Sequence, residues 1–96
     1  MKTKTKKKID PKIKITVDTR EPEHLVVLLT QMGVEVSRRM ITPGDYIISS
    51  KCAVERKTVH DFMGSMFSGR LFEQAEALRE AYAKPLLILE SDVRQG

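Results

Sequence analysis

The sequence predicts an α/β fold in which helices flank a mixed central β-sheet. Segments with alternating or continuous apolar residues, which are typical of strands, occur between segments whose apolar residues recur every three or four positions, which are typical of helices. Glycine and proline separate most of these segments. Because the chain has 96 residues, it has room for one small domain with a modest core.

The first half of the chain predicts a strand, a helix and a second strand. Residues 12–18 alternate polar and apolar side chains, as a half-buried strand does. Pro22 suits the first turn of a helix, and Gly33 is a typical stop. The helix between them is expected to bury one apolar stripe, made of Leu25, Leu28, Leu29 and Met32. Residues 34–40 then predict the second strand.

A hairpin follows, formed by strands at residues 45–49 and 53–57. The spacing of Thr58 and Asp61 resembles a capping box and predicts the start of a short helix. Gly69 separates this helix from a longer one, and Glu73 is expected on the solvated face of the longer helix. The residues expected on its buried face are Leu71, Ala75, Leu78 and Tyr82.

The last predicted element is a strand at residues 86–89, preceded by Pro85. Its four consecutive apolar residues indicate burial on both faces. Nothing after this strand could cover its far side, so we expect the domain to be incomplete at its C-terminus or to pair with another chain.

Composition narrows the class of protein. The apolar fraction of 41% and the charged fraction of 31% are typical of a globular protein, and no apolar run is long enough to predict a membrane span. The single Cys52 excludes an internal disulfide and a multi-cysteine zinc site, which favours an intracellular setting.

The net charge of +4 comes from the N-terminus. Seven lysines and one acid, Asp10, lie within the first 14 residues; the rest of the chain has 10 basic and 12 acidic residues. We expect residues 1–11 to be a disordered basic tail. It could attract phosphate backbones, or it could only improve solubility, and composition does not distinguish these roles.

Acidic residues occur at or near the ends of three predicted strands. They lie in residues 17–22, 44–46 and 55–58. Magnesium binds one or two carboxylates together with water and phosphate oxygens. Glu55 and Lys57 share one face of a strand, but Asp45 reaches that face only if the hairpin loop has an odd length or contains a β-bulge.

A metal site here would use Asp45 and Glu55, with the backbone carbonyl of Arg56 as a further ligand and Asp18 in the outer shell. The metal would activate a water molecule and neutralise charge on a phosphate. By spacing alone, however, an ordinary solvated strand is the favoured interpretation, because Glu and Lys two residues apart are common on such strands.

Two basic residues would act on the substrate. Lys57 could stabilise the attacking oxygen, and Arg20 could clamp a phosphate, since guanidinium groups match phosphate oxygens in pairs.

Taken together, the three acidic stretches resemble the nuclease domain of the XPF-type structure-specific endonucleases, including the archaeal XPF and Hef proteins. The family's hallmark is present as Gly44-Asp45, then Glu55-Arg56-Lys57 and Asp61. Residues 17–22 match the early Val-Asp-x-Arg-Glu motif. Residues 68–74 resemble the Arg-Leu-x-x-Gln segment, and residues 85–90 resemble the strand after it.

The resemblance implies a restriction-endonuclease-like core at residues 12–96 that cuts DNA near duplex/single-strand junctions, such as flaps, forks and splayed arms, in repair or fork processing. It implies Mg²⁺ or Mn²⁺ as cofactor. The implied catalytic residues are Asp45, Glu55 and Lys57, with Asp18 and Arg20 in or beside the site. Arg20, Arg56 and Arg70 are the candidate DNA contacts.

The resemblance also implies partners. Branched DNA and a homodimer or heterodimer within the family are expected, with association to a sliding clamp or helicase in a longer protein. The location would be the nucleoid or cytoplasm of an archaeon, or a eukaryotic nucleus. The alternative is a non-catalytic module that binds DNA or dimerises.

Overall fold

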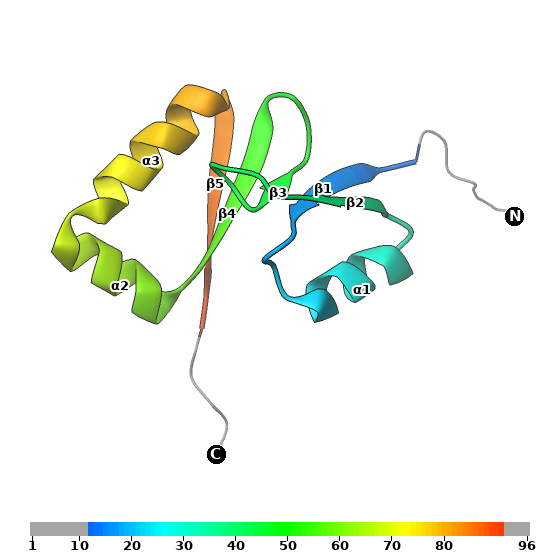
Figure 1. Ribbon diagram of the computed structural model, residues 1–96, viewed down its shortest axis with the longest axis horizontal. Helices are drawn as coiled ribbons and strands as arrows, with labels where there is room; N and C mark the ends of the chain where they lie inside the picture. The colour runs from blue at the N-terminus through cyan, green and yellow to red at the C-terminus, as the bar shows by residue number, and fades with distance from the viewer. Residues whose placement is uncertain (1–11, 92–96) are drawn as a thin grey trace, which may run out of the picture.

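The structure is a computed structural model that describes residues 12–91. They form a five-stranded sheet flanked by three helices (Figure 1). The elements are β1 (Lys14–Asp18), α1 (Glu23–Gln31), β2 (Glu35–Arg39), β3 (Tyr46–Ile47), β4 (Cys52–Thr58), α2 (Val59–Ser68), α3 (Arg70–Ala81) and β5 (Lys84–Glu90). This confirms the predicted order, although β3 is shorter than expected. The basic tail predicted at residues 1–11 lies outside the described residues.

The sheet is mixed, as predicted. Its strand order is β2-β1-β3-β4-β5. The pairs β1–β2 and β4–β5 are parallel, whereas β3 runs antiparallel to both β1 and β4. Helix α1 connects the first parallel pair and packs on β2, and helices α2 and α3 connect the second pair and pack beside β4 and β5 (Figure 1). Within residues 12–91, no helix is long and apolar enough to cross a membrane.

The core is small and lies under the middle of the sheet. Val17 of β1 and Ala53 of β4 are fully buried, and Leu78 of α3 is 7% exposed. Asp18 follows Val17 and is itself 2% exposed. The C-terminal end of β1 therefore places a carboxylate directly next to the core.

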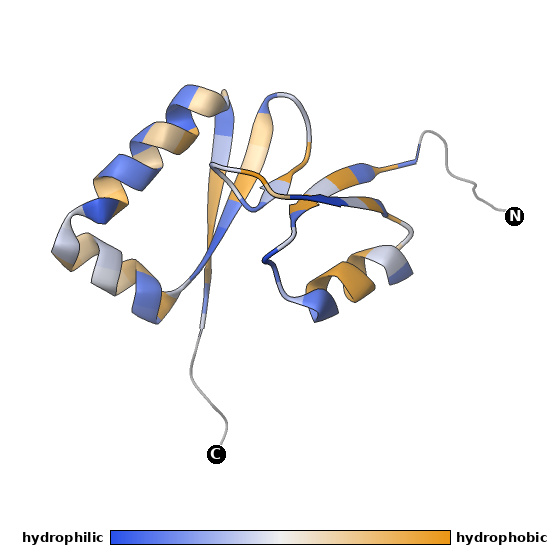
Figure 2. Cartoon of the chain, viewed as in Figure 1, coloured by the Kyte–Doolittle hydropathy of each residue, from blue (hydrophilic) through white to orange (hydrophobic). Residues whose placement is uncertain are grey.

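The burial predicted for α1 was wrong in part, because only Leu25 and Leu29 of its four stripe residues are half-buried. Val26 is its buried residue, whereas Leu28 is 51% and Met32 is 77% exposed. Because α1 packs on β2 near the sheet edge, part of its apolar stripe faces an open groove of about 460 Å³, which Ile88 of β5 also lines. Figure 2 shows the apolar middle of α1 in orange.

The burial predicted for β5 and α3 was also wrong. The four residues of β5 expected to be buried on both faces are 45–51% exposed: Leu86, Leu87, Ile88 and Leu89. The reason is that β5 is an edge strand, and the elements packed on it leave both faces accessible. Of the four residues expected on the buried face of α3, Leu78 alone is buried.

Candidate active site

The hairpin has the register that a shared acidic site requires. Tyr46 pairs with Val54 and Ile47 pairs with Ala53. The N–H groups of Ile48 and Ser49 both donate to the carbonyl of Cys52, at 3.0 and 3.2 Å. Ile48 and Ser49 thus lie opposite the single residue Cys52, and this arrangement is a β-bulge beside a two-residue turn. Because of this bulge, Asp45 and Glu55 lie on the same side of the sheet.

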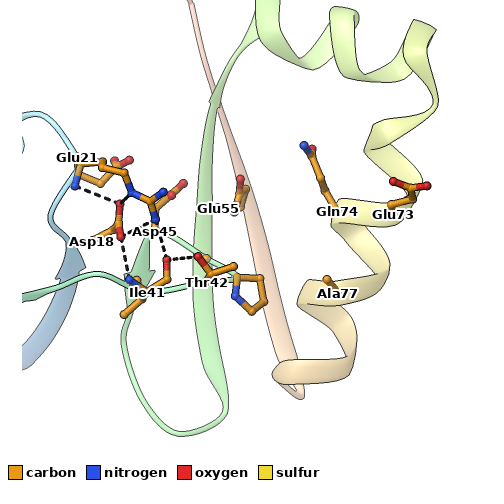
Figure 3. A pocket seen from close by; sticks show the side chains of 12 residues that line it. Asp18, Glu21, Ile41, Thr42, Asp45, Glu55, Glu73, Gln74 and Ala77 are labelled. Atoms are coloured by element: carbon orange, nitrogen blue, oxygen red, sulfur yellow. Dashed lines mark hydrogen bonds and ion pairs between the residues drawn. The ribbon is translucent and has the colours of Figure 1, made fainter.

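A cavity of about 530 Å³ lies between this end of the sheet and α3 (Figure 3). Its charged lining consists of five carboxylates and one guanidinium: Asp18, Glu21, Asp45, Glu55 and Glu73, with Arg20. Asp18 and Glu55 come from β1 and β4, Glu21 from the turn after β1, Asp45 from the position just before β3, and Glu73 from α3. Acidic groups therefore outnumber basic ones on the cavity wall, and the cavity is suited to a cation.

Burial raises the pKa of both the Asp45 and the Glu55 carboxyl groups. The charge of Asp45 raises the pKa of Glu55 further, and Lys57 opposes this effect. The backbone N–H of Arg56 donates to Asp45 Oδ2 at 2.7 Å and favours the ionised form of Asp45. The pair is thus held in place, but its two negative charges are disfavoured unless a cation lies between them.

Asp18 anchors Arg20. Its two oxygens accept four hydrogen bonds, from Arg20 Nε at 2.8 Å, Arg20 Nη2 at 3.0 Å, and the backbone N–H groups of Arg20 and Ile41 at 3.1 and 2.9 Å. These bonds lower the pKa of Asp18 to about 2, and the bonds from the Arg20 side chain have the largest effect. Both oxygens of Asp18 are thus engaged with Arg20 and Ile41, and the outer-shell role of Asp18 towards a metal stays a prediction. The Arg20 side chain is 62% exposed and lines the cavity.

The side chain of Arg56 faces the opposite side of the sheet from Glu55. It lines the apolar groove, and its Nε donates to Glu21 at 2.7 Å while Nη1 donates to Glu90. Both carboxylates raise the pKa of Arg56. The guanidinium, which we expected to contact DNA, is thus paired with two carboxylates and ties the turn after β1 to the end of β5.

Neither of the other two basic candidates lines the cavity. Lys57 Nζ is 4.0 Å from Glu55 Oε2, so it stands beside the acidic pair, but it does not line the cavity. Arg70 is exposed at the start of α3, donates to Ser68 Oγ at 3.1 Å and does not line the cavity either. Asp61 belongs to the cap of α2, where its N–H donates to Thr58 Oγ1 at 3.1 Å.

Three residues of the site were not predicted from the sequence. Arg38 of β2 donates from Nη2 to the carbonyls of Asp18, Thr19 and Glu21, and so holds the turn that carries Arg20. Glu73 and Gln74 of α3 line the cavity, and Glu73 is also exposed, as expected for a solvated face. The signal for Gln74 was its place in the Arg-Leu-x-x-Gln segment, whereas no sequence pattern marks Arg38.

The donor set of the cavity fits a hard divalent cation. Among residues 12–91 there is no group of three or more His, Cys, Asp or Glu side chains arranged around one metal position. Magnesium needs only one or two carboxylates, because water and phosphate oxygens supply its remaining ligands. Asp45 and Glu55 meet this requirement, and no histidine or cysteine lines the cavity.

Comparison with known proteins shows the family of the chain. The model of the ERCC4 domain matches residues 17–95. The DNA repair endonuclease XPF of Drosophila melanogaster is 44% identical over 80 residues, which cover 82% of this chain and 8% of that protein. The 3'-flap repair endonuclease Xpf of Saccharolobus solfataricus is 39% identical over 82 residues, which cover 84% of this chain and 35% of that protein. The chain thus spans a minor part of these relatives.

Solved structures share the fold. XPF from Aeropyrum pernix has a TM-score of 0.72 and 40% identity, over 79% of this chain and 36% of that one. XPF from Aeropyrum pernix in complex with DNA has a TM-score of 0.75 and 42% identity, over 81% of this chain and 40% of that one. The mixed sheet described above is the fold of these nucleases, and the chain belongs to the ERCC4 domain family.

Proposed function

We propose that this domain is a metal-dependent DNA endonuclease that hydrolyses phosphodiester bonds near duplex/single-strand junctions during repair or replication-fork processing. The observation that carries the proposal is that Asp45 and Glu55, from the two sides of a hairpin, line the same cavity. Burial of their carboxyl groups raises the pKa of both. The relatives support the same proposal, since the protein of Saccharolobus solfataricus is a 3'-flap repair endonuclease.

A divalent metal ion, Mg²⁺ or Mn²⁺, held by Asp45 and Glu55 would activate water and neutralise phosphate charge. The N–H of Arg56 keeps the Asp45 carboxylate oriented towards this position. Whether the Arg56 carbonyl is a further ligand stays a prediction. Each of these groups belongs to β4 or to the residue just before β3, so the proposed metal ligands would all come from one hairpin.

Two cations act on the substrate in this proposal. Lys57 lies beside Glu55 and stabilises negative charge on the attacking oxygen. Arg20 uses Nε and Nη2 to hold Asp18 and the carbonyl of Ile41, which fixes the plane of the guanidinium at the cavity wall. Its remaining N–H groups can bind a phosphate oxygen. Arg70, exposed at the start of α3, is proposed to contact DNA beyond the cavity.

The alternative is a non-catalytic module that binds DNA or dimerises. The exposed apolar residues of β5 favour an interface with another chain, because contiguous exposed apolar surface commonly marks one. The two functions are compatible, so dimerisation within the family is part of the proposal. Intracellular location, and association with a sliding clamp or helicase in a longer protein, belong to the same proposal.

Single-turnover cleavage of a labelled 3' flap tests the activity. We expect cleavage with Mn²⁺ or Mg²⁺ and none with EDTA, and we expect Asp45→Asn and Glu55→Gln to abolish it. Glu76→Gln is a matched control, because Glu76 lies on α3, pairs with Arg79 and does not line the cavity. Binding of the flap without cleavage under all metal conditions would instead support the non-catalytic module.

A further inference from the structure

We propose that Gln74 is a positioning residue whose amide oxygen accepts a hydrogen bond from a water molecule bound to the metal at Asp45 and Glu55. The proposal rests on the function proposed above and extends the site to α3. It adds a second wall to the site, opposite the hairpin that supplies the metal ligands (Figure 3).

The first observation is an unmatched acceptor. Between residues 12 and 91, two buried side-chain polar atoms lack a hydrogen-bond partner, Tyr46 Oη and Gln74 Oε1. Tyr46 faces the apolar groove, and burial, together with the nearby Glu21, raises its pKa. Gln74 is the one that lines the acidic cavity. A buried acceptor without a donor is unfavourable, so Gln74 would be stabilised by a donor that reaches its oxygen from the cavity.

The second observation is the way α3 is fixed. The helix begins at Arg70, directly after Gly69 in the left-handed conformation. Leu78 is buried and packs close to Gly44, the residue before Asp45. Gln74 lies one helical turn before Leu78 and therefore on the same face of α3. The contact that anchors the helix to the core thus directs Gln74 towards the acidic pair.

The surroundings of Gln74 define the donor. Carboxylates dominate the charged lining of the cavity, and an ionised carboxylate accepts hydrogen bonds but cannot donate one. A water molecule polarised by a divalent cation is a strong donor and small enough for a cavity of about 530 Å³ that also has to admit a phosphate. A neutral amide accepts its hydrogen without adding a negative charge to the five already present.

Calorimetric titration with Mn²⁺ in the absence of DNA tests the role directly. Gln74→Met has nearly the same size but no amide oxygen, and it should weaken Mn²⁺ binding by about 10- to 100-fold, the range found when an outer-shell partner is lost. Gln74→Glu keeps an acceptor and should bind Mn²⁺ at least as tightly as the wild type. Glu76→Gln, on the same helix outside the cavity, should change nothing.

Flap cleavage and thermal unfolding complete the experiment. The proposal is overturned if folded Gln74→Met binds Mn²⁺ and cuts like the wild type. It is also overturned if Gln74→Glu loses Mn²⁺ affinity as strongly as Gln74→Met, because an accepting oxygen would then not be the required group. Gln74→Ala replaces Gln74→Met if the latter does not fold. A wild-type domain that neither binds Mn²⁺ nor cuts contradicts the proposed function, whereas a wild-type domain that cuts with unaffected Gln74 variants contradicts this inference alone.

Discussion

The backbone N–H of Arg56 donates a 2.7 Å hydrogen bond to the carboxylate of Asp45, while the side chain of Arg56 leaves the opposite face of the sheet. One residue of β4 therefore orients a proposed metal ligand with its main chain and braces the sheet with its guanidinium. The stability of the domain and the geometry of its site depend on the same short hairpin.

Asp45→Asn should separate stability from activity. The pKa of Asp45 is raised, so its ionised form is disfavoured in the folded state, and this penalty is present above the folded pKa and absent below the unfolded value of 3.8. Asparagine removes the charge and can still accept from Arg56. We expect a higher melting temperature than the wild type at pH 7 in EDTA, and no further rise on adding Mn²⁺, which should stabilise the wild type by binding. A lower melting temperature in EDTA would contradict this expectation.

Lys57→Ala should affect the chemical step. Removing a group that stabilises developing charge typically lowers the rate by about 100- to 1000-fold. Mn²⁺ affinity should be kept or increased. In the wild type, Lys57 Nζ lies 4.0 Å from Glu55 Oε2, and its positive charge competes with the metal ion for this carboxylate. Single-turnover rates at saturating Mn²⁺ measure the effect. A rate that recovers fully as Mn²⁺ is raised would show that Lys57 acts on metal binding instead.

The pair formed by Asp18 and Arg20 should make the fold sensitive to acid. The pKa of Asp18 falls to about 2 in the folded state from 3.8, so its contribution is complete above pH 4 and is lost as the pH falls towards 2. Arg20→Ala should be less stable than the wild type at pH 7, and the difference should shrink through this window. Urea unfolding between pH 7 and pH 2 checks the expectation, which a pH-independent difference would refute.

Gly44→Ala should destabilise the hairpin. Gly44 has a φ of +98°, and a side chain in left-handed conformation costs about 1–2 kcal/mol. Its Cβ would also lie 3.4 Å from the Cβ of Ala53. Gly64→Ala is the matched control: Gly64 lies within α2 with open space around it, so alanine there should stabilise the domain by about 0.5–1 kcal/mol. Chemical denaturation of both variants measures the contrast.

The exposed apolar surface of β5 should drive self-association of the isolated domain. Leu86 and Ile88 are each 51% exposed and, being two residues apart on a strand, share one face. Replacing both with threonine puts a β-branched side chain at each position, which suits a strand, while reducing apolar area. Sedimentation velocity should show less association for the double variant than for the wild type, and a monomeric wild type at high concentration would contradict the prediction.

Local patterns were sufficient to predict the order of the elements, since periodicity and glycine or proline positions depend on near neighbours in the sequence. Burial was harder, because the exposure of Leu28 or Leu87 depends on which elements pack on them in space. The bulge opposite Cys52 was predicted only as a condition for Asp45 and Glu55 to share a face, since its presence depends on the geometry of the turn. The pairing of Arg56 with Glu21 and Glu90 joins residues 35 and 34 positions apart, and no local pattern encodes it.

The bridge that Arg56 forms with Glu21 and Glu90 has a consequence for biosynthesis. Glu21, Arg56 and Glu90 come from the first, middle and last parts of the described chain, so the bridge cannot close until Glu90 has left the ribosome. Until then Arg56 has one of its two carboxylates, and β4 lacks its parallel partner β5. A nascent chain would therefore acquire its complete hairpin support only after β5 has emerged from the ribosome.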